Sequence, residues 1–283
     1  MTEQALVQDL TITTTDAFPL AATCFEVTGS DVWVLINSAT AVPRQFYRRF
    51  ASYIQNQGWS ALTYDYRGIG ESRPESLRGF KAKMRDWALY DMTGVIDWVV
   101  HEHQPRKLFV VGHSVGGQAL GLLENGHHIN AVVSVSAQSG YWGVQAKSER
   151  QRTRLIVSVA MPVLSRLLGY FPWSNLGAGE DLPKGVALEW SRWCRQRNYL
   201  LDDTTLPLER YQQFKAPILS YSIDDDVWGN KQAVDEMMRA YSQVERRHIR
   251  PTDYGLSSIK HMGFFRPQSQ ILWKEALTWL KQT

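Results

Sequence analysis

The chain has 283 residues, of which 44% are hydrophobic and 12% aromatic, and its formal net charge is +3. This length and apolar content can bury a sizeable core, so we expect a globular enzyme or binding protein. The net charge is small and the basic clusters are short, which argues against a nucleic-acid partner.

Two segments near the start of the chain alternate between apolar and polar residues. Residues 6–16 and 21–27 are rich in Val, Ile and Thr, which predicts two antiparallel strands. Later segments are short and almost continuously apolar, as strands buried on both faces require. These predicted buried strands cover residues 32–37, 59–65, 107–111, 129–136 and 217–223.

Helical patterns separate the buried strands. Aromatic and aliphatic residues recur at four-residue spacing between Pro43 and Gly58, where the helix is expected to end. Further helices are predicted at about residues 81–100 and 271–282. Strands that alternate with helices form βαβ units, so the sequence predicts a mainly parallel sheet covered by helices on both faces.

One region interrupts this alternation. Residues 141–215 contain helical stretches and several aromatic residues but no convincing strand. A structureless loop of that length would be unusual in a compact domain. We therefore predict a single domain over residues 1–283, with residues 141–215 inserted between two strands as a small helical cap.

Ser114 stands in the pentapeptide GHSVG, between a predicted strand that ends at Val111 and a predicted helix. Both the letters and this context are those of the G-x-S-x-G nucleophile elbow. Gly112 and Gly116 would relieve crowding around a serine on a tight, strained turn. The N–H groups at the start of the helix would point at an anion that forms beside the hydroxyl. Ser114 is therefore the predicted nucleophile.

A serine hydroxyl needs a general base, and His261 is the best placed of the seven histidines. It lies in the segment IKHMGFFRPQ, which is a predicted loop between the last strand and the last helix. The base needs an orienting acid, and Asp224, Asp225 and Asp226 directly follow the predicted strand at 217–223. Strand alternation and the distance from the strand end favour Asp225 over Asp226.

The tetrahedral intermediate of acyl transfer needs two N–H donors, which form an oxyanion hole. One is expected from the backbone of Val115, directly after the nucleophile. The other is expected from the segment NSATAV after the strand at 32–37, where Ala39 or Thr40 would supply it. We favour Ala39.

The segments GHSVGG, DYRGIGES, DDD and KHMGFF together resemble the α/β-hydrolase superfamily. More narrowly, the chain resembles a bacterial group of predicted α/β hydrolases related to the serine-aminopeptidase and lysophospholipase-like branch. The resemblance covers nearly the whole chain outside the cap. It implies an α/β-hydrolase fold, with an eight-stranded, mostly parallel sheet flanked by helices and a variable cap between strands six and seven.

The resemblance also implies roles for single residues. Ser114 would be the nucleophile, His261 the general base and acid, and the aspartate after strand seven the residue that orients His261, which matches Asp225. The segment DYRGIGES would be a structural loop near the site. Asn37 and Ser38 stand where the family commonly has His-Gly, which is a departure beside the oxyanion loop.

These residues favour a serine hydrolase that cleaves an ester or thioester with an apolar acyl group. An acyltransferase would use the same residues, and a non-catalytic binding protein would be expected to have lost one of them. An aminopeptidase would need an acidic cluster for the substrate ammonium, for which residues 179–182, Asp202 and Asp203 are the candidates. Dehalogenases and epoxide hydrolases are excluded, because they carry an aspartate at the position of Ser114.

The remaining features predict a cytoplasmic protein that works on a small acyl substrate without a metal or organic cofactor. Cys24 and Cys194 have no metal-ligand or redox spacing, which indicates reduced thiols. The first ten residues carry acids and lack an apolar core, so we expect no secretory signal. Polar residues and a proline interrupt the longest apolar stretch, residues 155–173, so we expect no stable membrane insertion. The sequence does not indicate an oligomeric state.

Overall fold

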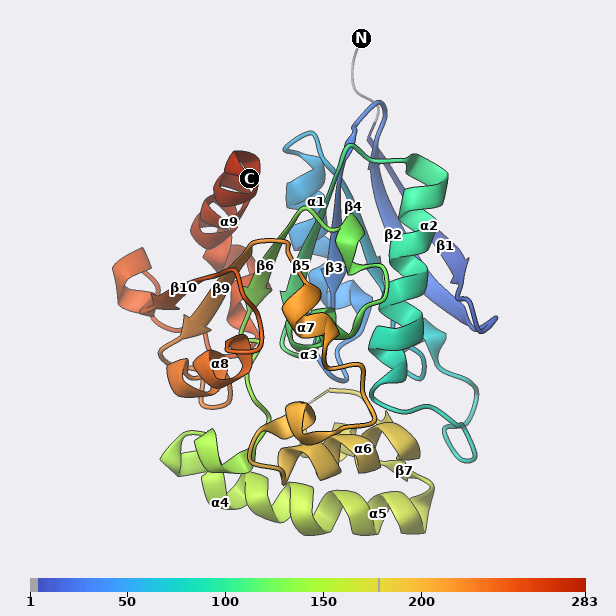
Figure 1. Ribbon diagram of the computed structural model, residues 1–283, viewed down its shortest axis with the longest axis vertical. Coiled ribbons are helices and arrows are strands. Elements are labelled where there is room, and N and C mark those ends of the chain that lie inside the picture. Colours follow the sequence, from blue (N-terminus) through green and yellow to red (C-terminus); the bar gives the residue numbers. More distant parts are fainter. Residues whose placement is uncertain (1–4, 178) are drawn as a thin grey trace.

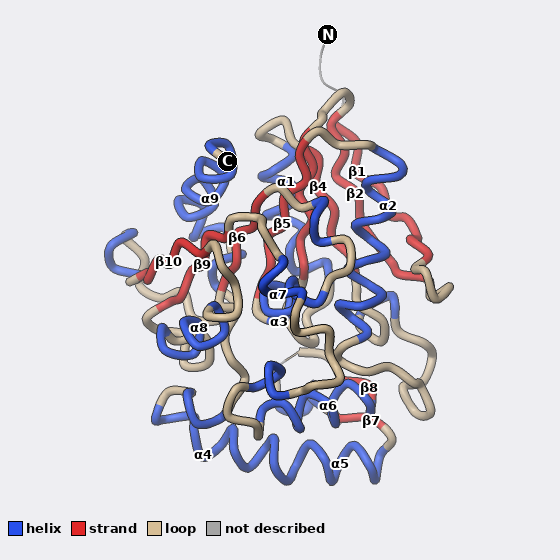
Figure 2. Tube along the Cα trace, viewed as in Figure 1, coloured by secondary structure: helices blue, strands red, loops and turns tan. Residues whose placement is uncertain are grey.

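The computed structural model describes residues 5–177 and 179–283, within which eight strands form one sheet in the order β1-β2-β4-β3-β5-β6-β9-β10 (Figures 1 and 2). The strands of this sheet are β1 (Ala5–Thr13), β2 (Pro19–Val27), β3 (Val32–Asn37), β4 (Ser60–Tyr64), β5 (Lys107–His113), β6 (Ala131–Val135), β9 (Ile218–Ile223) and β10 (Val244–Ile249). Neighbouring strands are parallel except at β2, which runs antiparallel to β1 and to β4. The predicted mostly parallel sheet is therefore confirmed.

The helices occupy the segments between these strands and the segment after β10. They are α1 (Arg48–Gln55), α2 (Thr93–His103), α3 (Val115–Gln118), α4 (Lys147–Leu155), α5 (Met161–Leu168), α6 (Lys184–Cys194), α7 (Arg210–Gln213), α8 (Lys231–Met238) and α9 (Gln270–Gln282). None of the helices in the described part of the chain has the length and apolar character needed to cross a bilayer.

The pleat of the central strands sends alternate side chains into two separate cores. In β3, Trp33 and Leu35 belong to one core, whereas Val34 and Ile36 belong to the other. Side chains of α2, α3, α7 and α8 complete the first core, and α1 and α9 complete the second. Burial on both faces explains why these strands are almost continuously apolar.

The helix predicted for residues 81–100 begins later than its periodicity indicates. Residues Trp87–Met92 form a π-helical turn, and α2 follows directly after it. The backbone N–H of Arg85 donates to the carboxylate of Glu189 in α6, at 2.9 Å. A contact with a segment about a hundred residues later therefore takes the place of a helical hydrogen bond.

Between β6 and β9 the chain leaves the sheet. α4, α5 and α6, with the short ladder of β7 (Tyr170–Phe171) and β8 (Leu182–Pro183), form a layer beyond the carboxyl ends of the central strands (Figure 1). Arg85 ties this layer to the rest of the molecule. Its Nε donates to Glu189 at 2.7 Å, and a terminal N–H donates to Asp203 at 2.9 Å.

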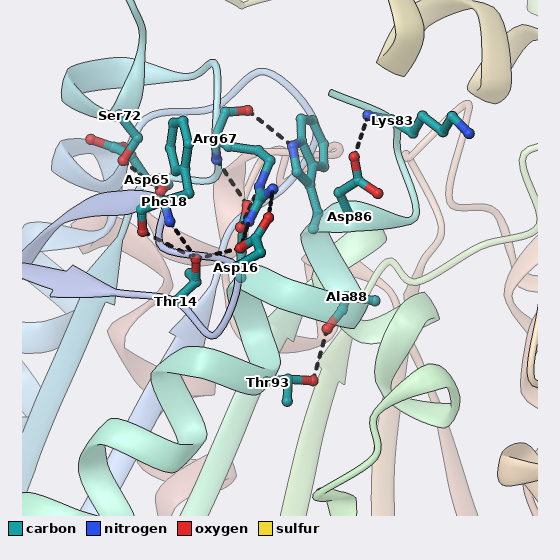
Figure 3. A network of polar contacts seen from close by, with 12 residues as sticks. Thr14, Asp16, Phe18, Asp65, Arg67, Ser72, Lys83, Asp86, Ala88 and Thr93 are labelled. Atoms are coloured by element: carbon teal, nitrogen blue, oxygen red, sulfur yellow. Dashed lines mark hydrogen bonds and ion pairs between the residues drawn. The ribbon is translucent and has the colours of Figure 1, made fainter. Parts of the chain in front are cut away.

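A partly buried polar cluster joins the β1–β2 turn, the loop after β4 and the segment before α2 (Figure 3). Arg67 donates two terminal N–H groups to the carboxylate of Asp16, at 2.7 and 2.9 Å. Its Nε and backbone N–H donate to the buried carboxylate of Asp91, at 2.7 and 2.9 Å. The indole N–H of Trp87 donates to the Arg67 carbonyl at 3.1 Å. These contacts support a structural role for the DYRGIGES loop.

Candidate active site

Ser114 lies at the sharp turn between β5 and α3. Its backbone has φ 52° and ψ −118°, which a non-glycine residue seldom adopts and which marks a strained position. A Cβ at Gly112 would lie 2.5 Å from the carbonyl oxygen of Gly116, and one at Gly116 would collide with the backbone of Asn37. The two glycines therefore permit the close packing that this turn requires.

The helix after Ser114 is shorter than the elbow pattern indicates. α3 has only four residues and continues as a 3₁₀ turn over Ala119–Leu122. Val115 is the first residue of α3, so its N–H has no acceptor within the helix. This N–H is adjacent to the serine and is available to an anion at this turn.

The loop between β10 and α9 brings His261 to the same cavity as Ser114. The Nδ1 of His261 is hydrogen bonded to Oδ2 of Asp226 at 2.8 Å. The acid beside the histidine is thus Asp226, and the prediction that Asp225 orients His261 is wrong. The Asp225 carboxylate instead accepts hydrogen bonds from Ser258 Oγ at 2.7 Å and from two backbone N–H groups at 2.8 and 2.9 Å.

The error has a physical reason in the chain direction after β9. Strand alternation assumes extended backbone, but the strand ends at Ile223 and the N–H of Asp226 bonds back to the Ile223 carbonyl at 3.1 Å. The chain therefore turns at the aspartates themselves, with Asp224 and Asp225 inside the turn. This turn places Asp226 against the imidazole and Asp225 against the backbone that precedes His261.

The Asp226 carboxylate is held in its charged form. Burial alone would raise its pKa, but the His261 ring, the hydrogen bond from that ring and the backbone N–H of Gly229 lower the pKa of Asp226 to about 2. A charged carboxylate accepts the proton on Nδ1 of His261, which leaves Nε2 of the neutral ring as a base.

Ser114 and His261 both line this cavity, but their side chains are not hydrogen bonded to each other among the described residues. The Ser114 hydroxyl is 3.5 Å from Oε1 of Gln138, a long contact that the sequence did not indicate. In the structure the Ser114 hydroxyl therefore contacts Gln138 and not the imidazole of His261.

The loop after β3 also differs from its prediction. The N–H of Ala39 donates to the hydroxyl of Tyr47 at 2.8 Å, so Ala39 is not available as the second oxyanion donor. The next residue, Thr40, lines the cavity together with Ser114. Of the two residues that the sequence offered, Thr40 is the better candidate.

A chain of buried hydrogen bonds connects this loop to the histidine loop. The Tyr47 hydroxyl lies 2.8 Å from Nδ1 of His113, and Nε2 of His113 lies 2.9 Å from the His261 carbonyl. Because a carbonyl only accepts, Nε2 of His113 carries the proton and Tyr47 donates to Nδ1. Burial and the neighbouring His261 lower the pKa of His113 well below its usual value, which keeps it neutral. No sequence pattern points to Tyr47.

The cavity beside Ser114 has a volume of about 110 Å³ and a mostly apolar wall. The insertion supplies most of that wall, with Ile156, Val157, Trp173, Leu176, Trp190 and Cys194. From the rest of the molecule, Trp228 packs edge-on against the His261 ring, with ring centroids 5.4 Å apart. The site can therefore receive an apolar group next to a hydroxyl and an imidazole.

Solved structures with this fold include several esterases. The esterase Pf2001 from Pyrococcus furiosus superposes with a TM-score of 0.64 at 16% identity, over 98% of this chain and 93% of that one. The α/β hydrolase GrgF from Penicillium sp. sh18 gives a TM-score of 0.65 at 18% identity, over 98% of both chains. A malate-bound thermophilic esterase from Thermogutta terrifontis gives a TM-score of 0.61 at 16% identity, over 97% of this chain and 98% of that one. At these identities the likeness establishes the fold.

No curated protein matches the sequence. The family model described as serine aminopeptidase S33 matches residues 34–188, more than half of the chain, including β3, β4, the elbow at Ser114 and much of the insertion. The fold and this match agree with the resemblance that the motifs indicated, and the chain belongs to the serine aminopeptidase S33 family of α/β hydrolases.

Proposed function

We propose that the protein is a serine hydrolase that cleaves an ester or thioester of a small apolar acyl group. The observation that carries this proposal is one cavity lined both by the strained Ser114 and by His261, whose ring is hydrogen bonded to Asp226. Esterases among the structures with this fold are consistent with it.

In the proposed mechanism, Ser114 Oγ attacks the substrate carbonyl while Nε2 of His261 takes the hydroxyl proton. Asp226 holds the imidazole in the tautomer with the proton on Nδ1 and stabilises the imidazolium that forms. The N–H groups of Val115 and Thr40 stabilise the oxyanion. His261 then protonates the leaving alcohol or thiol, and water, deprotonated by the same ring, hydrolyses the acyl-enzyme.

The size of the cavity supports a short acyl group. A cavity of about 150 Å³ holds a benzene molecule in another protein, and the cavity here has about 110 Å³. We therefore expect acyl chains of a few carbons to react faster than long ones. In this proposal residues 141–215 act as the cap of a single domain over residues 1–283, because this segment lines the cavity.

Aminopeptidase activity is less well supported, because the acidic candidates have other partners. Asp203 binds Arg85 and Arg192, Asp202 binds Asn198, and Glu180 accepts the N–H of Gly70. Among the described residues, the cavity wall contains a single carboxylate, Glu149, which is paired with Arg152. No free acidic cluster is therefore available there to bind a substrate ammonium.

Acyl transfer to an alcohol would use the same residues. A binding protein without catalytic activity would have no use for the strained backbone at Ser114.

The two cysteines are buried free thiols, which is consistent with a reducing compartment and with the expected cytoplasmic location.

The test is hydrolysis of p-nitrophenyl esters from acetate to octanoate, beside aminoacyl p-nitroanilides, by the wild type and by Ser114→Ala. We expect turnover of short esters, little turnover of anilides, and a loss of roughly 10⁵-fold in kcat in the variant. Equal rates for both enzymes on every ester, with both folded, would contradict the proposal.

A further inference from the structure

The outer helix of the insertion exposes a row of apolar side chains. Leu155, Val159, Val163 and Leu167 have exposed fractions of 61%, 50%, 47% and 76%. They are four residues apart and all exposed, so they follow the outer side of the helical segment formed by α4, the π-helical turn Ile156–Ala160 and α5. At about 1.5 Å per residue the row is roughly 18 Å long. We call these four side chains the outer stripe.

The opposite side of the same segment is covered by protein. Val157, Met161 and Ser165 are buried, and Val157 also lines the cavity beside Ser114. α4 and α5 lie at the end of the molecule opposite the N-terminal strands, and no other element of the described residues lies outside them (Figures 1 and 2). The outer stripe is thus an apolar surface beyond what the core requires.

The charge around the outer stripe has one sign. Residues 147–168 contain five basic residues and one acidic residue, which gives this segment a net charge of +4. Lys147, Arg152, Arg154 and Arg166 are exposed, and the one acidic residue, Glu149, is paired with Arg152. Three exposed cations therefore border the stripe without a carboxylate partner among the described residues, namely Lys147, Arg154 and Arg166.

An apolar row beside cations fits some binding partners of this surface better than others. A second copy packed helix against helix would bring the arginines of both copies together, with almost no acidic residues on either face to pair with them. Nucleic acid would leave the Leu and Val side chains without a partner. A lipid bilayer with anionic headgroups fits both features. The outer stripe can insert at the boundary between headgroups and acyl chains, and the flanking cations can bind the headgroup phosphates.

We propose that the outer stripe and its flanking cations dock the protein on an anionic lipid surface, with the segment 147–168 lying in the plane of the interface. This docking is peripheral, in keeping with the absence of a helix in the described residues that could cross a bilayer. The proposal rests on the outer face alone and is independent of the chemistry at Ser114.

The experiment is co-sedimentation of the full chain with phosphatidylglycerol vesicles and with phosphatidylcholine vesicles. The test variant is Val163→Glu with Leu167→Glu. The matched control is Leu6→Glu with Ile271→Glu, which changes two exposed apolar residues on β1 and α9, at 49% and 53% exposure, by the same charge. Circular dichroism and ester hydrolysis in solution establish that each variant is folded.

We expect the wild type and the control to bind phosphatidylglycerol vesicles more tightly than phosphatidylcholine vesicles, with binding weakened by salt. The test variant should bind about tenfold more weakly than the control. Binding to neither vesicle would overturn the proposal. So would a concentration-dependent dimer that the test variant abolishes without any vesicle binding, because the stripe would then join two copies of the chain.

Discussion

Asp91 and Asp226 are both buried carboxylates. Asp91 is paired with an arginine and Asp226 with a histidine, and the two partners differ in their other contacts. Asp91 binds Arg67, and the remaining terminal N–H groups of Arg67 bind Asp16 (Figure 3). Asp226 binds Nδ1 of His261, whose ring also lines the cavity beside Ser114. Arg67 in the first set is paired with two carboxylates, whereas His261 in the second set is paired with one carboxylate and also lines the cavity beside Ser114.

The chemistry of the two partners separates them further. A guanidinium keeps its proton at any pH that a protein survives, so the Arg67 cluster can hold segments together but cannot move a proton. An imidazole exchanges its proton near neutral pH and can serve as a base. Burial and hydrogen bonding alone therefore do not mark a functional site. A functional site is better indicated by a side chain that can exchange a proton and that lines a cavity beside a nucleophile, as His261 does beside Ser114.

Among the substitutions that test this comparison, we expect the largest loss of activity at Asp226. Asp226→Asn removes the charge that fixes the His261 tautomer, so kcat/KM for a short ester should fall by about 10⁴-fold. Asp225→Asn, its neighbour and matched control, should change kcat/KM less than about tenfold, because Asp225 binds only the loop before His261. Steady-state kinetics measure both. The reverse ranking would restore Asp225 as the orienting acid.

Breaking the Arg67 cluster should instead lower the free energy of unfolding. Arg67→Met leaves the buried carboxylate of Asp91 without its cation, which should lower the free energy of unfolding by about 3–5 kcal/mol. Urea unfolding measures this change. Arg106→Met removes an exposed ion pair with Asp31 and should leave the urea midpoint unchanged. If both variants unfold at the wild-type midpoint, the cluster does not stabilise the fold.

Acid should remove the contributions of His113 and Asp226 to stability over different pH ranges. The pKa of His113 is lowered in the folded protein, so unfolded chains take up its proton first and stability falls as pH drops below about 6.5. The pKa of Asp226 is lowered to about 2, so its contribution is present above about pH 4 and is lost as pH falls toward 2. Urea unfolding across pH measures both losses.

A variant separates these two ranges. His113→Gln should be less stable at pH 8 and should show a smaller decline between about pH 6.5 and 4.5, where His103 and His128, whose pKa values burial also lowers, still contribute. If the variant keeps the wild-type slope in that range, a group other than His113 causes the decline.

The smallest effect is expected at Tyr47. Tyr47→Phe removes the hydroxyl that accepts from Ala39 and donates to His113, which should cost about 1–3 kcal/mol of stability. Tyr53→Phe, on the same side of the sheet, is the control, because no hydrogen bond of its hydroxyl occurs within the described residues. Thermal unfolding compares the two. Equal melting temperatures would mean that the chain of hydrogen bonds adds nothing.

The sheet was predictable because burial on two faces leaves a local signature in each strand, and β3 has the predicted bounds. The helix expected at residues 81–100 is present but begins later, near Trp87, since a contact with α6 engages the backbone N–H of Arg85. At the site, Ser114 carries a local motif. The candidates for the orienting acid and for the second oxyanion donor do not, because the turn at the end of β9 brings Asp226 to His261, and the hydroxyl of Tyr47 accepts the N–H of Ala39.

The most direct measurement is intact mass after incubation with a fluorophosphonate, on the wild type and on Ser114→Ala. An activated serine attacks the phosphorus and retains a single covalent adduct. We expect one adduct on the wild type and none on the folded variant. No adduct on the folded wild type, or an adduct that persists in Ser114→Ala, would contradict the assignment of Ser114 as the nucleophile.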